Sequence, residues 1–347
     1  MQFGQSRKRD ILTLLGLTLV GAAAATWPLD AIAQAPQLPE IGFLSSGSSA
    51  EFATFVGAFR QGMSEQRYVD GRDVSIIFRW ADGKYDKLQT LANDLVGRKV
   101  KLIVASGGLI SAQAALKATA SIPILFVSGF DPVELGLVAS LNRPGRNATG
   151  AWVLTTELLP KRLELLHNLG ARIGTIGFLV NPKSVTAERD RKAAEEAKQQ
   201  LRTFNASTER EITAAFELAA QEQVSAFVVT ADPFFNTRRH QIVTLAACQG
   251  VPVIYPWREY VEAGGLMSYG AELTWGYNLV GRYAGRILGR EQAKPGDLPV
   301  QLAATFKLVI NLDTAKALGL NLEDVAPQLI SLADETIEKG QVTACPQ

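Results

Sequence analysis

The chain has 347 residues, of which 35 are Lys or Arg and 34 are Asp or Glu, so its formal net charge is +1. Residues 1–33 are typical of an export signal, and their removal takes away three basic and two acidic residues. This leaves 314 residues with 32 basic and 32 acidic side chains. A neutral chain does not favour nucleic acid or an anionic membrane as partner, because both attract strongly basic proteins. A chain of this length usually exceeds one hydrophobic core, so we expect two domains.

Residues 1–33 have the three regions of a secretory signal peptide. Arg7-Lys8-Arg9 is a positive start, residues 11–25 are apolar but short for a membrane span, and Ala31-Ile32-Ala33 fits the small-residue pattern before a cleavage site. We expect cleavage after Ala33. Residues 6–12 also resemble a twin-arginine signal with Lys in place of one Arg, which leaves the export route open between the two systems. No cysteine lies near this site, so we predict a free periplasmic protein rather than a lipoprotein.

In the first half of the mature chain, apolar strands alternate with amphipathic helices. The helix after the first strand opens with Ser48 and Glu51, the pair of a capping box, and carries Phe52, Phe55 and Phe59 at helical spacing. We interpret that aromatic stripe as core. The expected strands are 41–44, 74–78, 101–104 and 122–127, and the expected helices are 48–63, 84–98, 109–119 and 133–141.

The second half repeats this order of elements. Ile-Gly-Phe-Leu occurs at 41–44 and again at 176–179, and similar loops and strands follow each copy. A spacing of about 135 positions is too long for a solenoid repeat, so it indicates two similar lobes. Strands are expected at 173–180, 225–230, 251–255, 266–269 and 305–310, and helices at 158–169, 184–201, 209–221, 236–249, 274–289 and 312–318.

These patterns predict an α/β protein with two similar lobes, each a parallel sheet flanked by helices, joined by several hinge crossings. Lobe 1 is expected to comprise residues 40–150 and about 266–300, and lobe 2 residues 151–265. Residues 301–335 are expected to form a C-terminal crossing segment, whose lobe the sequence leaves open. A cleft between two such lobes is a natural place to hold a small molecule.

Two loops rich in serine and glycine follow the first and third strands, at the carboxyl edge where open parallel sheets bind ligands. Ser46 and Ser48 lie in the first loop, and Ser106 and Gly107 lie in the second. Each loop leads into a helix, whose free N–H groups and positive dipole end suit a carboxylate or another anion. For the first loop, the alternative is that it only forms a cap and a turn.

Carboxylates and aromatic rings follow strands in both halves. The expected ligand contacts among them are Phe130, Asp131, Asp232, Phe234, Tyr255 and Tyr269. A carboxylate beside a ring suits an ammonium group and a flat ligand. Each aspartate precedes a proline, so the alternative is an N-cap with proline at the first helical position. For the tyrosines, the alternative is core packing between the lobes.

Side chains able to do covalent or metal chemistry are few. His167 and His240 are the only histidines, and neither has metal-ligand spacing. The serine loops lack a Gly-x-Ser-x-Gly elbow, and no phosphate-binding or dinucleotide fingerprint is present. We therefore predict no enzyme activity, no cofactor and no metal, with acyl transfer by Ser106 and His240 as the disfavoured alternative. Cys248 is interpreted as a buried small apolar residue, with a disulfide to Cys345 as the alternative.

Several segments together resemble one protein family over essentially the whole mature chain. They are Ile-Gly-Phe-Leu at 41–44, Phe-Arg-Trp-Ala-Asp-Gly at 78–83, Asp-Pro-Val at 131–133 continuing to Gly-Leu-Val at 136–138, Leu-Asn-Arg-Pro-Gly-Arg-Asn-Ala-Thr-Gly at 141–150, Gly-Gly-Leu-Met-Ser-Tyr-Gly at 264–270 and Lys-Leu-Val-Ile-Asn at 307–311. The chain resembles the periplasmic solute-binding proteins of ABC transporters, in the group that includes tryptophan- and tyrosine-transport binding proteins.

The resemblance implies a type I periplasmic-binding-protein fold that closes on a small molecule and delivers it to an inner-membrane permease driven by a cytoplasmic ATPase. Ligand contacts in such folds come from loops that here hold Ser46, Ser106, Asp131, Asp232 and Tyr269. The resemblance does not fix the ligand; the aromatic residues and loop amides favour an aromatic, carboxylate-bearing, amino-acid-like molecule. The alternative function is a ligand-binding sensor for a membrane signalling partner, and a periplasmic hydrolase is disfavoured by the missing catalytic constellation.

Overall fold

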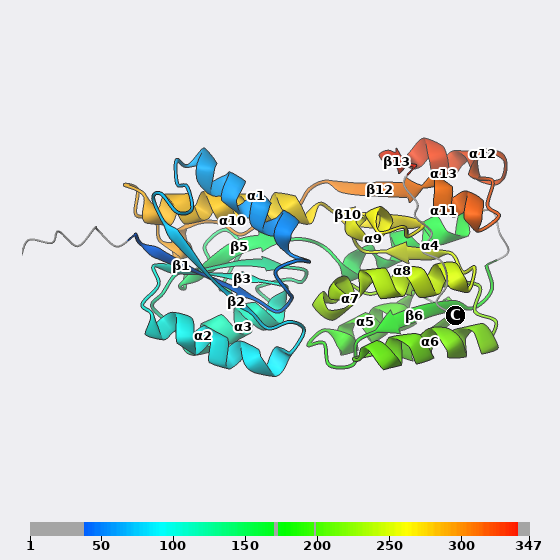
Figure 1. The fold of residues 1–347 in the computed structure, drawn as a ribbon, viewed down its shortest axis with the longest axis horizontal. Helices are drawn as coiled ribbons and strands as arrows, with labels where there is room; N and C mark the ends of the chain where they lie inside the picture. The colour runs from blue at the N-terminus through cyan, green and yellow to red at the C-terminus, as the bar shows by residue number, and fades with distance from the viewer. Residues whose placement is uncertain (1–37, 170–172, 198, 339–347) are drawn as a thin grey trace, which may run out of the picture. The chain divides into compact units, whose positions relative to one another are not determined.

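The structure is a computed structural model that describes residues 38–169, 173–197 and 199–338. The expected signal peptide, residues 1–33, and Cys345 lie outside the described residues. Between residues 38 and 338 the strands form two sheets with helices on both faces, which confirms the predicted α/β architecture (Figure 1). We call each sheet with its helices a lobe. In this described part, no helix has both the length and the apolar character that crossing a membrane requires.

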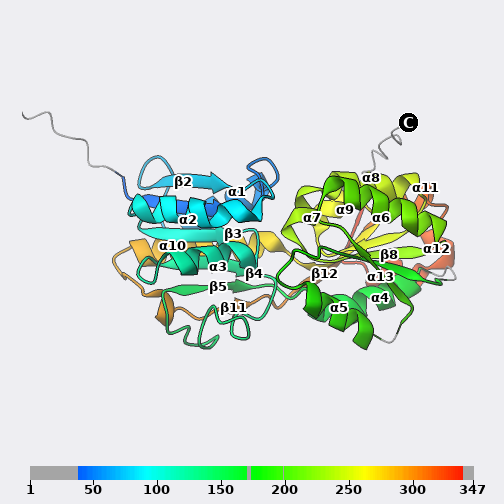
Figure 2. The ribbon, with the colours of Figure 1, turned by 90° about the horizontal axis from the view of Figure 1, so that it is seen from below.

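The sheet of lobe 1 has six strands in the order β11-β5-β4-β3-β1-β2, all paired in parallel, with β2 and β11 at its edges (Figure 2). These strands are β1 Glu40–Ser45, β2 Ser75–Trp80, β3 Leu102–Ser106, β4 Ile124–Ser128, β5 Ala148–Trp152 and β11 Gln301–Leu302. On one face lie α1 (Ala53–Glu65) and α10 (Leu273–Leu288), and on the other lie α2 (Leu88–Gly97) and α3 (Leu109–Ala118). A short 3₁₀ helix, Tyr85–Lys87, precedes α2, and another, Pro295–Asp297, follows α10.

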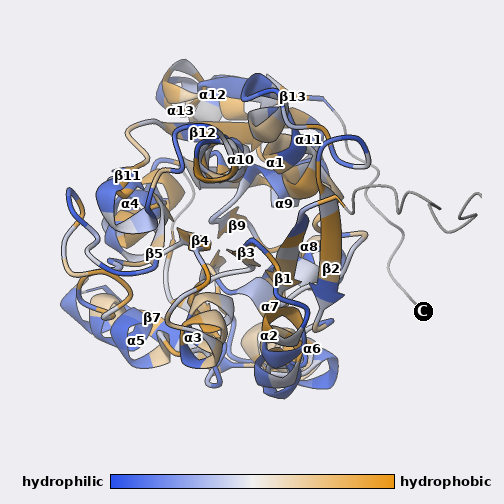
Figure 3. Cartoon of the chain, turned by 90° about the vertical axis from the view of Figure 1, so that its left-hand side faces the viewer, coloured by the Kyte–Doolittle hydropathy of each residue, from blue (hydrophilic) through white to orange (hydrophobic). Residues whose placement is uncertain are grey.

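Side-chain alternation decides which core each strand residue joins. Ile41 and Phe43 of β1 belong to the core under α1 and α10, whereas Leu44 belongs to the core under α2 and α3. Figure 3 accordingly shows mainly hydrophobic strands beside helices of mixed character. The two helices α1 and α10 lie very close, because a Cβ atom added at Gly62 would come within 2.0 Å of the carbonyl oxygen of Asn278. Glycine is therefore required at that contact.

The sheet of lobe 2 has seven strands in the order β13-β12-β10-β9-β8-β6-β7. They are β6 Ile176–Val180, β7 Leu201–Asn205, β8 Ala226–Val229, β9 Val253–Tyr255, β10 Met267–Ala271, β12 Phe306–Asn311 and β13 Glu335–Ile337. This sheet is mostly parallel, but β10 and β12 pair antiparallel. Its helices are α4 Leu159–His167 after a 3₁₀ turn Thr156–Leu158, α5 Ala187–Glu196, α6 Glu209–Gln221, α7 Pro233–Thr237, α8 Arg239–Cys248, α9 Arg258–Glu262, α11 Leu312–Ala317, α12 Leu322–Val325 and α13 Pro327–Leu332.

The chain passes between the lobes at three points within the described residues. These are residues 153–158 after β5, residue 272 between β10 and α10, and residues 303–305 between β11 and β12. The several crossings that the sequence predicted are therefore present. Short parallel crossings of this kind allow rotation of one lobe against the other while limiting other motions.

The expected lobe boundaries need one correction, and the structure assigns the segment that the sequence left open. The segment expected in lobe 1 from about 266 begins with β10, but β10 pairs with β9 and β12 in lobe 2, so only α10 and the residues after it join lobe 1. The segment 301–335 divides between the lobes, because β11 pairs with β5 in lobe 1 whereas β12 and β13 complete the sheet of lobe 2. Strand patterns reveal that a segment is β, but they do not reveal which of two similar sheets it joins.

Four local expectations were also wrong. The helix expected at 184–201 is shorter, and the edge strand β7 follows it; only Phe204 of β7 is fully buried, so its pattern is weak. The helix expected at 133–141 is a series of turns, and Gly136 has a φ of +67°, which a helix does not allow. The helix expected from Ser48 begins at Ala53. Cys248 is half-buried and disulfide-bonded rather than a buried free thiol.

Candidate functional site

A cavity lies where the carboxyl ends of the strands of both lobes meet. It has a volume of about 740 Å³, including the part open to solvent. Lobe 1 contributes loops after β2, β3 and β4 and the starts of α1, α3 and α10, and lobe 2 contributes loops after β6, β8 and β9. Both the volume and the position at the strand ends are typical of small-molecule sites.

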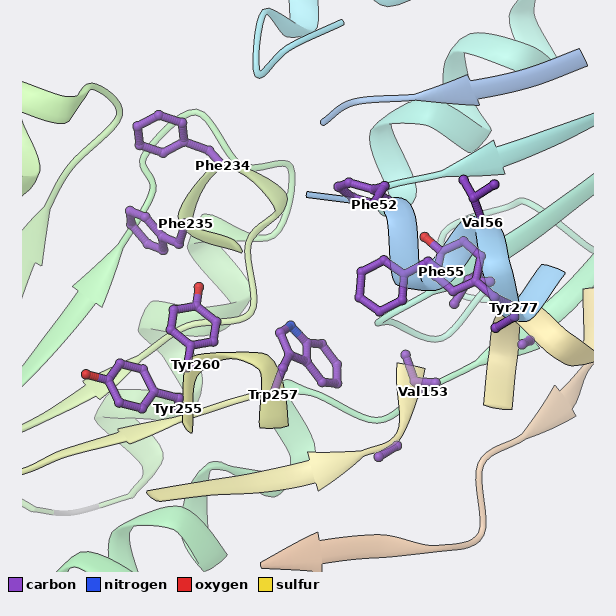
Figure 4. Packing of buried hydrophobic residues seen from close by; sticks show 14 of the residues in the cluster. Phe52, Phe55, Val56, Val153, Phe234, Phe235, Tyr255, Trp257, Tyr260 and Tyr277 are labelled. Carbon is purple, nitrogen blue, oxygen red and sulfur yellow. The ribbon is translucent and has the colours of Figure 1, made fainter. Parts of the chain in front are cut away.

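One wall of the cavity is aromatic. Phe55 of α1 stacks on Tyr277 of α10, with ring centroids 4.9 Å apart and planes 12° apart, and Phe52 meets Phe55 edge-on at 5.4 Å. All three residues line the cavity together with Phe130. Trp257, the residue before α9, projects from lobe 2 toward Phe55 and lines the same space (Figure 4). Such a wall binds flat apolar groups by contact and ring stacking.

The two serine loops of lobe 1 support this wall with their own hydrogen bonds. The Ser46 hydroxyl donates to the Gly107 carbonyl oxygen at 2.7 Å, and the hydroxyls of Ser106 and Tyr277 lie 2.7 Å apart. The Gly107 N–H donates to the Tyr277 hydroxyl at 3.3 Å. Of the predicted residues in these loops, Gly107 lines the cavity, whereas Ser46 and Ser106 lie buried behind it. Ser48 is held in a turn by Glu51, which accepts from its N–H and its hydroxyl.

The glycines of the second loop bring a helix start to the cavity. Gly107 and Gly108 have φ values of +76° and +90°, which favour glycine, and a Cβ at Gly107 would lie 2.2 Å from the Ser46 hydroxyl oxygen. The helix α3 then begins at Leu109 with no side-chain cap. Its first N–H groups have no partner within the helix, so they can bind a carboxylate.

Asp232 is the main charged residue of the lobe 2 wall. It is 4% exposed, and its Oδ1 accepts from the Asn181 amide at 2.9 Å, the Phe234 N–H at 2.9 Å and the Tyr85 hydroxyl at 3.3 Å. Burial raises the pKa of Asp232, and the bonds from Asn181 and Phe234 oppose that rise. Asp232 both caps α7, with Pro233 at the first helical position, and lines the cavity, so the two interpretations of this residue are not exclusive.

Two buried oxygens of this wall have no hydrogen-bond partner among the described residues. They are Oδ2 of Asp232 and Oδ1 of Asn236, which lies one helical turn further along α7. Both residues line the cavity and each is 4% exposed. Buried acceptors are usually paired in native proteins, so these two oxygens are available to a donor that enters the cavity.

The structure places the remaining predicted contacts elsewhere. Asp131 accepts from the N–H groups of Val133 and Glu134 in a turn and does not line the cavity. Phe234 packs on Phe235, and Tyr255 is 1% exposed and stacks on Tyr260 at 4.7 Å. Tyr269 lies within β10, with its ring beside Phe306 and its carbonyl oxygen bonded by Arg162. None of these four side chains lines the cavity.

The histidines do not join the cavity. Nδ1 of His167 lies 2.7 Å from the Leu163 carbonyl oxygen of the same helix, and His240 lines a separate groove with Glu51 and Glu259. The Ser106 hydroxyl is bonded to Tyr277 rather than to a histidine. Among the described residues, no three or more His, Cys, Asp or Glu side chains group as metal ligands would.

Most lining residues were not predicted as contacts, and four of them matter for the site. Tyr85 and Asn236 carried no motif signal, and Phe55 and Tyr277 were taken as helix core or left unassigned. The aromatic stripe 52–59 was a usable signal, because side chains in the first turn of a helix after a β-strand extend over the carboxyl edge of the sheet. Trp257 stood beside the predicted Tyr255 and lines the cavity in its place.

Comparison with known proteins gives consistent matches. A protein-family model described as ABC transporter substrate binding protein matches residues 45–337. A tyrosine-binding protein of Clostridioides difficile (strain R20291) is 29% identical over 270 residues, which are 76% of this chain and 75% of that protein. The structure of an ABC domain in complex with L-Trp from Streptococcus pneumonia is similar, with a TM-score of 0.74 and 26% identity over 86% of this chain and 100% of that one. The ligand-free, open structure of a substrate-binding protein with adhesive properties from Clostridium difficile has a TM-score of 0.60 and 25% identity over 82% and 96% of the two chains.

Proposed function

The chain belongs to the family of ABC transporter substrate-binding proteins, and from that premise we propose that it captures an aromatic amino acid as a zwitterion between its two lobes. Capture of a solute for an ABC transporter is the work of this family. The identity of the solute is the new part of the proposal, and it depends on the chemistry of the cavity walls.

The observation that carries the proposal is the pair of unpartnered acceptors, Asp232 Oδ2 and Asn236 Oδ1. An α-ammonium group has three N–H donors and a positive charge, so one group can satisfy both oxygens at once. Its charge would also favour the ionised form of Asp232, whose pKa is otherwise raised by burial. A neutral sugar hydroxyl offers one donor and no charge, so it fits this pair less well.

A carboxylate site lies next to this pair. The start of α3 faces the turn that holds Asp232, because a Cβ at Gly108 would lie 3.1 Å from Cγ of Pro233. The uncapped N–H groups that begin at Leu109 suit a negative group. An α-carboxylate and an α-ammonium are separated by one carbon atom, so a single amino acid can reach both walls.

The side chain of the ligand is expected to lie against the aromatic wall of Phe52, Phe55 and Trp257. The relatives support an aromatic group, because one is described as a tyrosine-binding protein and another was solved with L-Trp. We further propose that the ligand is released unchanged to a membrane permease. The family match supports this, as does the engagement of the Ser106 hydroxyl with Tyr277.

The proposed location is the periplasm. Family membership places such proteins outside the cytoplasm, and the signal-like residues 1–33, which lie outside the described residues, support export across the inner membrane. An Arg7→Lys, Arg9→Lys variant distinguishes the general export route from the twin-arginine route. The measurement is whether the variant still leaves the cytoplasm. A twin-arginine substrate would be retained.

Calorimetric titration of the mature protein tests the ligand proposal. The panel contains L-tryptophan, L-tyrosine, D-ribose and two truncated analogues of tryptophan. Indole-3-propionate lacks the ammonium group, and tryptamine lacks the carboxylate. We expect L-tryptophan or L-tyrosine to bind at least about 100-fold more tightly than either truncated analogue, because each analogue leaves a buried polar group unpaired. Binding of ribose alone, or equal binding of indole-3-propionate and L-tryptophan, would contradict the proposal.

A further inference from the structure

Tyr85 belongs to lobe 1, where a hydrogen-bonded loop precedes it. It follows a loop in which Asp82 and Gly83 have φ values of +52° and +76°, so the backbone folds back on itself. The N–H of Asp82 donates to the Gly47 carbonyl oxygen at 3.2 Å, and that of Gly83 donates to the Ser46 carbonyl oxygen at 2.8 Å. These backbone bonds tie the loop before Tyr85 to the loop that follows β1 in lobe 1.

The Tyr85 hydroxyl reaches the other lobe. It accepts a hydrogen bond from the Phe234 N–H at 2.9 Å and lies 3.3 Å from Oδ1 of Asp232, to which it can donate. Burial and the nearby Asp232 charge raise the pKa of Tyr85 well above its ordinary value, so the hydroxyl keeps its proton. One hydroxyl thus bonds both the cap and the first turn of α7, the helix that carries the unpartnered acceptors Asp232 and Asn236.

The bonds to Oδ1 of Asp232 differ in when they can form. Those from Asn181 and Phe234 come from lobe 2 itself, so they persist whatever the position of lobe 1. The bond from Tyr85 spans the two lobes, so it exists only when they approach. Together the three donors occupy Oδ1 and leave Oδ2 for a ligand.

We propose that Tyr85 is a positioning residue that fixes Asp232 for the ligand ammonium as the lobes close, which rests on the proposed amino-acid function. Closure then completes the ammonium site as well as enclosing it. An amino acid gains affinity from this step, whereas an analogue without an ammonium gains much less. Tyr85 therefore couples lobe closure to recognition of the ammonium group.

The bond between Tyr85 and Asp232 is expected when the lobes are closed, and the lobes of this structure resemble the ligand-bound arrangement more than the open one. The chain is about equally identical to the L-Trp complex and to the ligand-free, open structure, at 26% and 25%, but its TM-score is higher with the complex, at 0.74 against 0.60. Two other polar contacts also join the lobes, Glu51 with Arg238 at 3.7 Å and Glu134 with Arg189 at 2.6 Å. The first pair is long and the second is exposed at Glu134, so both contribute little, whereas the Tyr85 bonds are partly buried and reach Asp232, which is 4% exposed.

Surface plasmon resonance with the Tyr85→Phe variant tests this proposal, because it measures association and dissociation without an optical signal from the indole of the ligand or of the protein. Phenylalanine keeps the ring and removes only the hydroxyl. We expect the dissociation rate of L-tryptophan to rise about 10-fold with little change in the association rate, because the lost bonds form after encounter. The affinity ratio between L-tryptophan and indole-3-propionate should fall by a similar factor, a change that a purely structural role would not produce.

Tyr283→Phe is the matched control. The Tyr283 hydroxyl also makes two hydrogen bonds, donating to the Pro299 carbonyl oxygen at 2.8 Å and accepting from the Gln301 amide at 3.0 Å, but both partners are in lobe 1. This variant should keep the wild-type dissociation rate and affinity ratio. If Tyr85→Phe matches Tyr283→Phe in both, the positioning role is wrong and the amino-acid function stands. If the wild-type protein binds no amino acid, the proposed function fails and this inference fails with it.

Discussion

The two lobes differ in what they bury. In lobe 1 the buried polar residues are uncharged serines and threonines, and those near the cavity, such as Ser46 and Ser106, are paired within the lobe. Among the described residues of lobe 2, three charged side chains are buried, Arg162, Asp190 and Asp232. Burial of a charge is costly unless it is paired, so charges in such positions usually serve a function. In the proposed site, lobe 1 therefore provides the aromatic wall and the helix start for the carboxylate, and lobe 2 provides the charged side chain for the ammonium group.

This difference predicts that removal of the cavity charge in lobe 2 changes affinity more than stability, and that disruption of the hydrogen bonds behind the aromatic wall in lobe 1 does the reverse. The largest effect is expected for Asp232→Asn. Asparagine retains the capping of α7 but removes the negative charge, so affinity for L-tryptophan should fall at least about 100-fold, as measured by calorimetry.

Asp131→Asn is the control for that experiment. Asp131 stands in the equivalent Asp-Pro sequence of the first half, but it accepts from turn N–H groups and does not line the cavity. Its substitution should change affinity less than about 2-fold, in the range of ordinary surface changes. Equal losses in the two variants would remove the assignment of charge recognition to lobe 2.

The corresponding test in lobe 1 is Tyr277→Phe. Its hydroxyl bonds Ser106 and the Gly107 N–H inside the wall, and burial raises its pKa to about 12, so it remains neutral. Removal should lower the free energy of unfolding by about 1–3 kcal/mol, because buried partners are left unpaired. Affinity should fall by about 10-fold or less, as expected for a shift of the wall without loss of a charge contact.

Tyr260→Phe is a matched control for the stability measurement. Tyr260 is as deeply buried, in lobe 2, but its hydroxyl has no hydrogen-bond partner among the described residues. Urea unfolding should therefore show no loss of stability, or a small gain, when that hydroxyl is removed. A similar loss for both tyrosines would indicate that the pairing seen at Tyr277 does not matter.

The buried charge of Asp190 should appear as a pH dependence. Burial raises the pKa of Asp190 to about 6 from 3.8, partly offset by hydrogen bonds from Thr156 and Thr186. The folded state then binds more protons than the unfolded state between those values, so the contribution of Asp190 to stability falls as pH rises from about 4 to about 6.

Asp190→Asn should flatten that slope. Between pH 4 and pH 7 the wild-type protein should lose about 2 kcal/mol of unfolding free energy relative to the variant. The slope is the informative quantity, because removal of the charge also takes a counter-charge from Arg162 and leaves Glu157 as the nearby carboxylate. Parallel pH profiles of the two proteins would show that Asp190 does not titrate in this range.

The smallest effect is expected at the rim. Glu134 is 60% exposed and pairs with Arg189 across the lobes at 2.6 Å. Exposed ion pairs contribute between about 0 and 1 kcal/mol, so Glu134→Gln should change affinity less than about 5-fold, and less still in high salt. A larger loss of affinity would indicate that the exposed Glu134–Arg189 pair, rather than Tyr85, couples the two lobes.

Much of the fold followed from the sequence because its signals are local. Alternating strands and amphipathic helices, with the repeated Ile-Gly-Phe-Leu, were sufficient to predict two α/β lobes. Asp232 was found for a similar reason, because a carboxylate after a buried strand and before a proline marks a helix start at the ligand-binding edge. The edge strand β7 was missed, because Arg202 and Asn205 face solvent and leave little apolar pattern.

The rest of the site depends on contacts between distant segments. Tyr85 meets Asp232 across 147 positions of sequence, and Tyr277 meets Ser106 across 171. Patterns among neighbouring residues do not predict contacts between positions so far apart in the sequence. Tyr255 and Tyr269 were chosen for lying near strand ends, but the side to which a ring points depends on the register of its strand.

The most direct test is a crystal structure of the mature protein with L-tryptophan. We predict that the ligand lies between the lobes with its ammonium nitrogen about 2.7–3.0 Å from Asp232 Oδ2 and within hydrogen-bond distance of Asn236. Its carboxylate should face the N–H groups at the start of α3, and its indole should face Trp257. A ligand whose ammonium group contacts neither Asp232 nor Asn236, or one bound outside this cavity, would contradict the account.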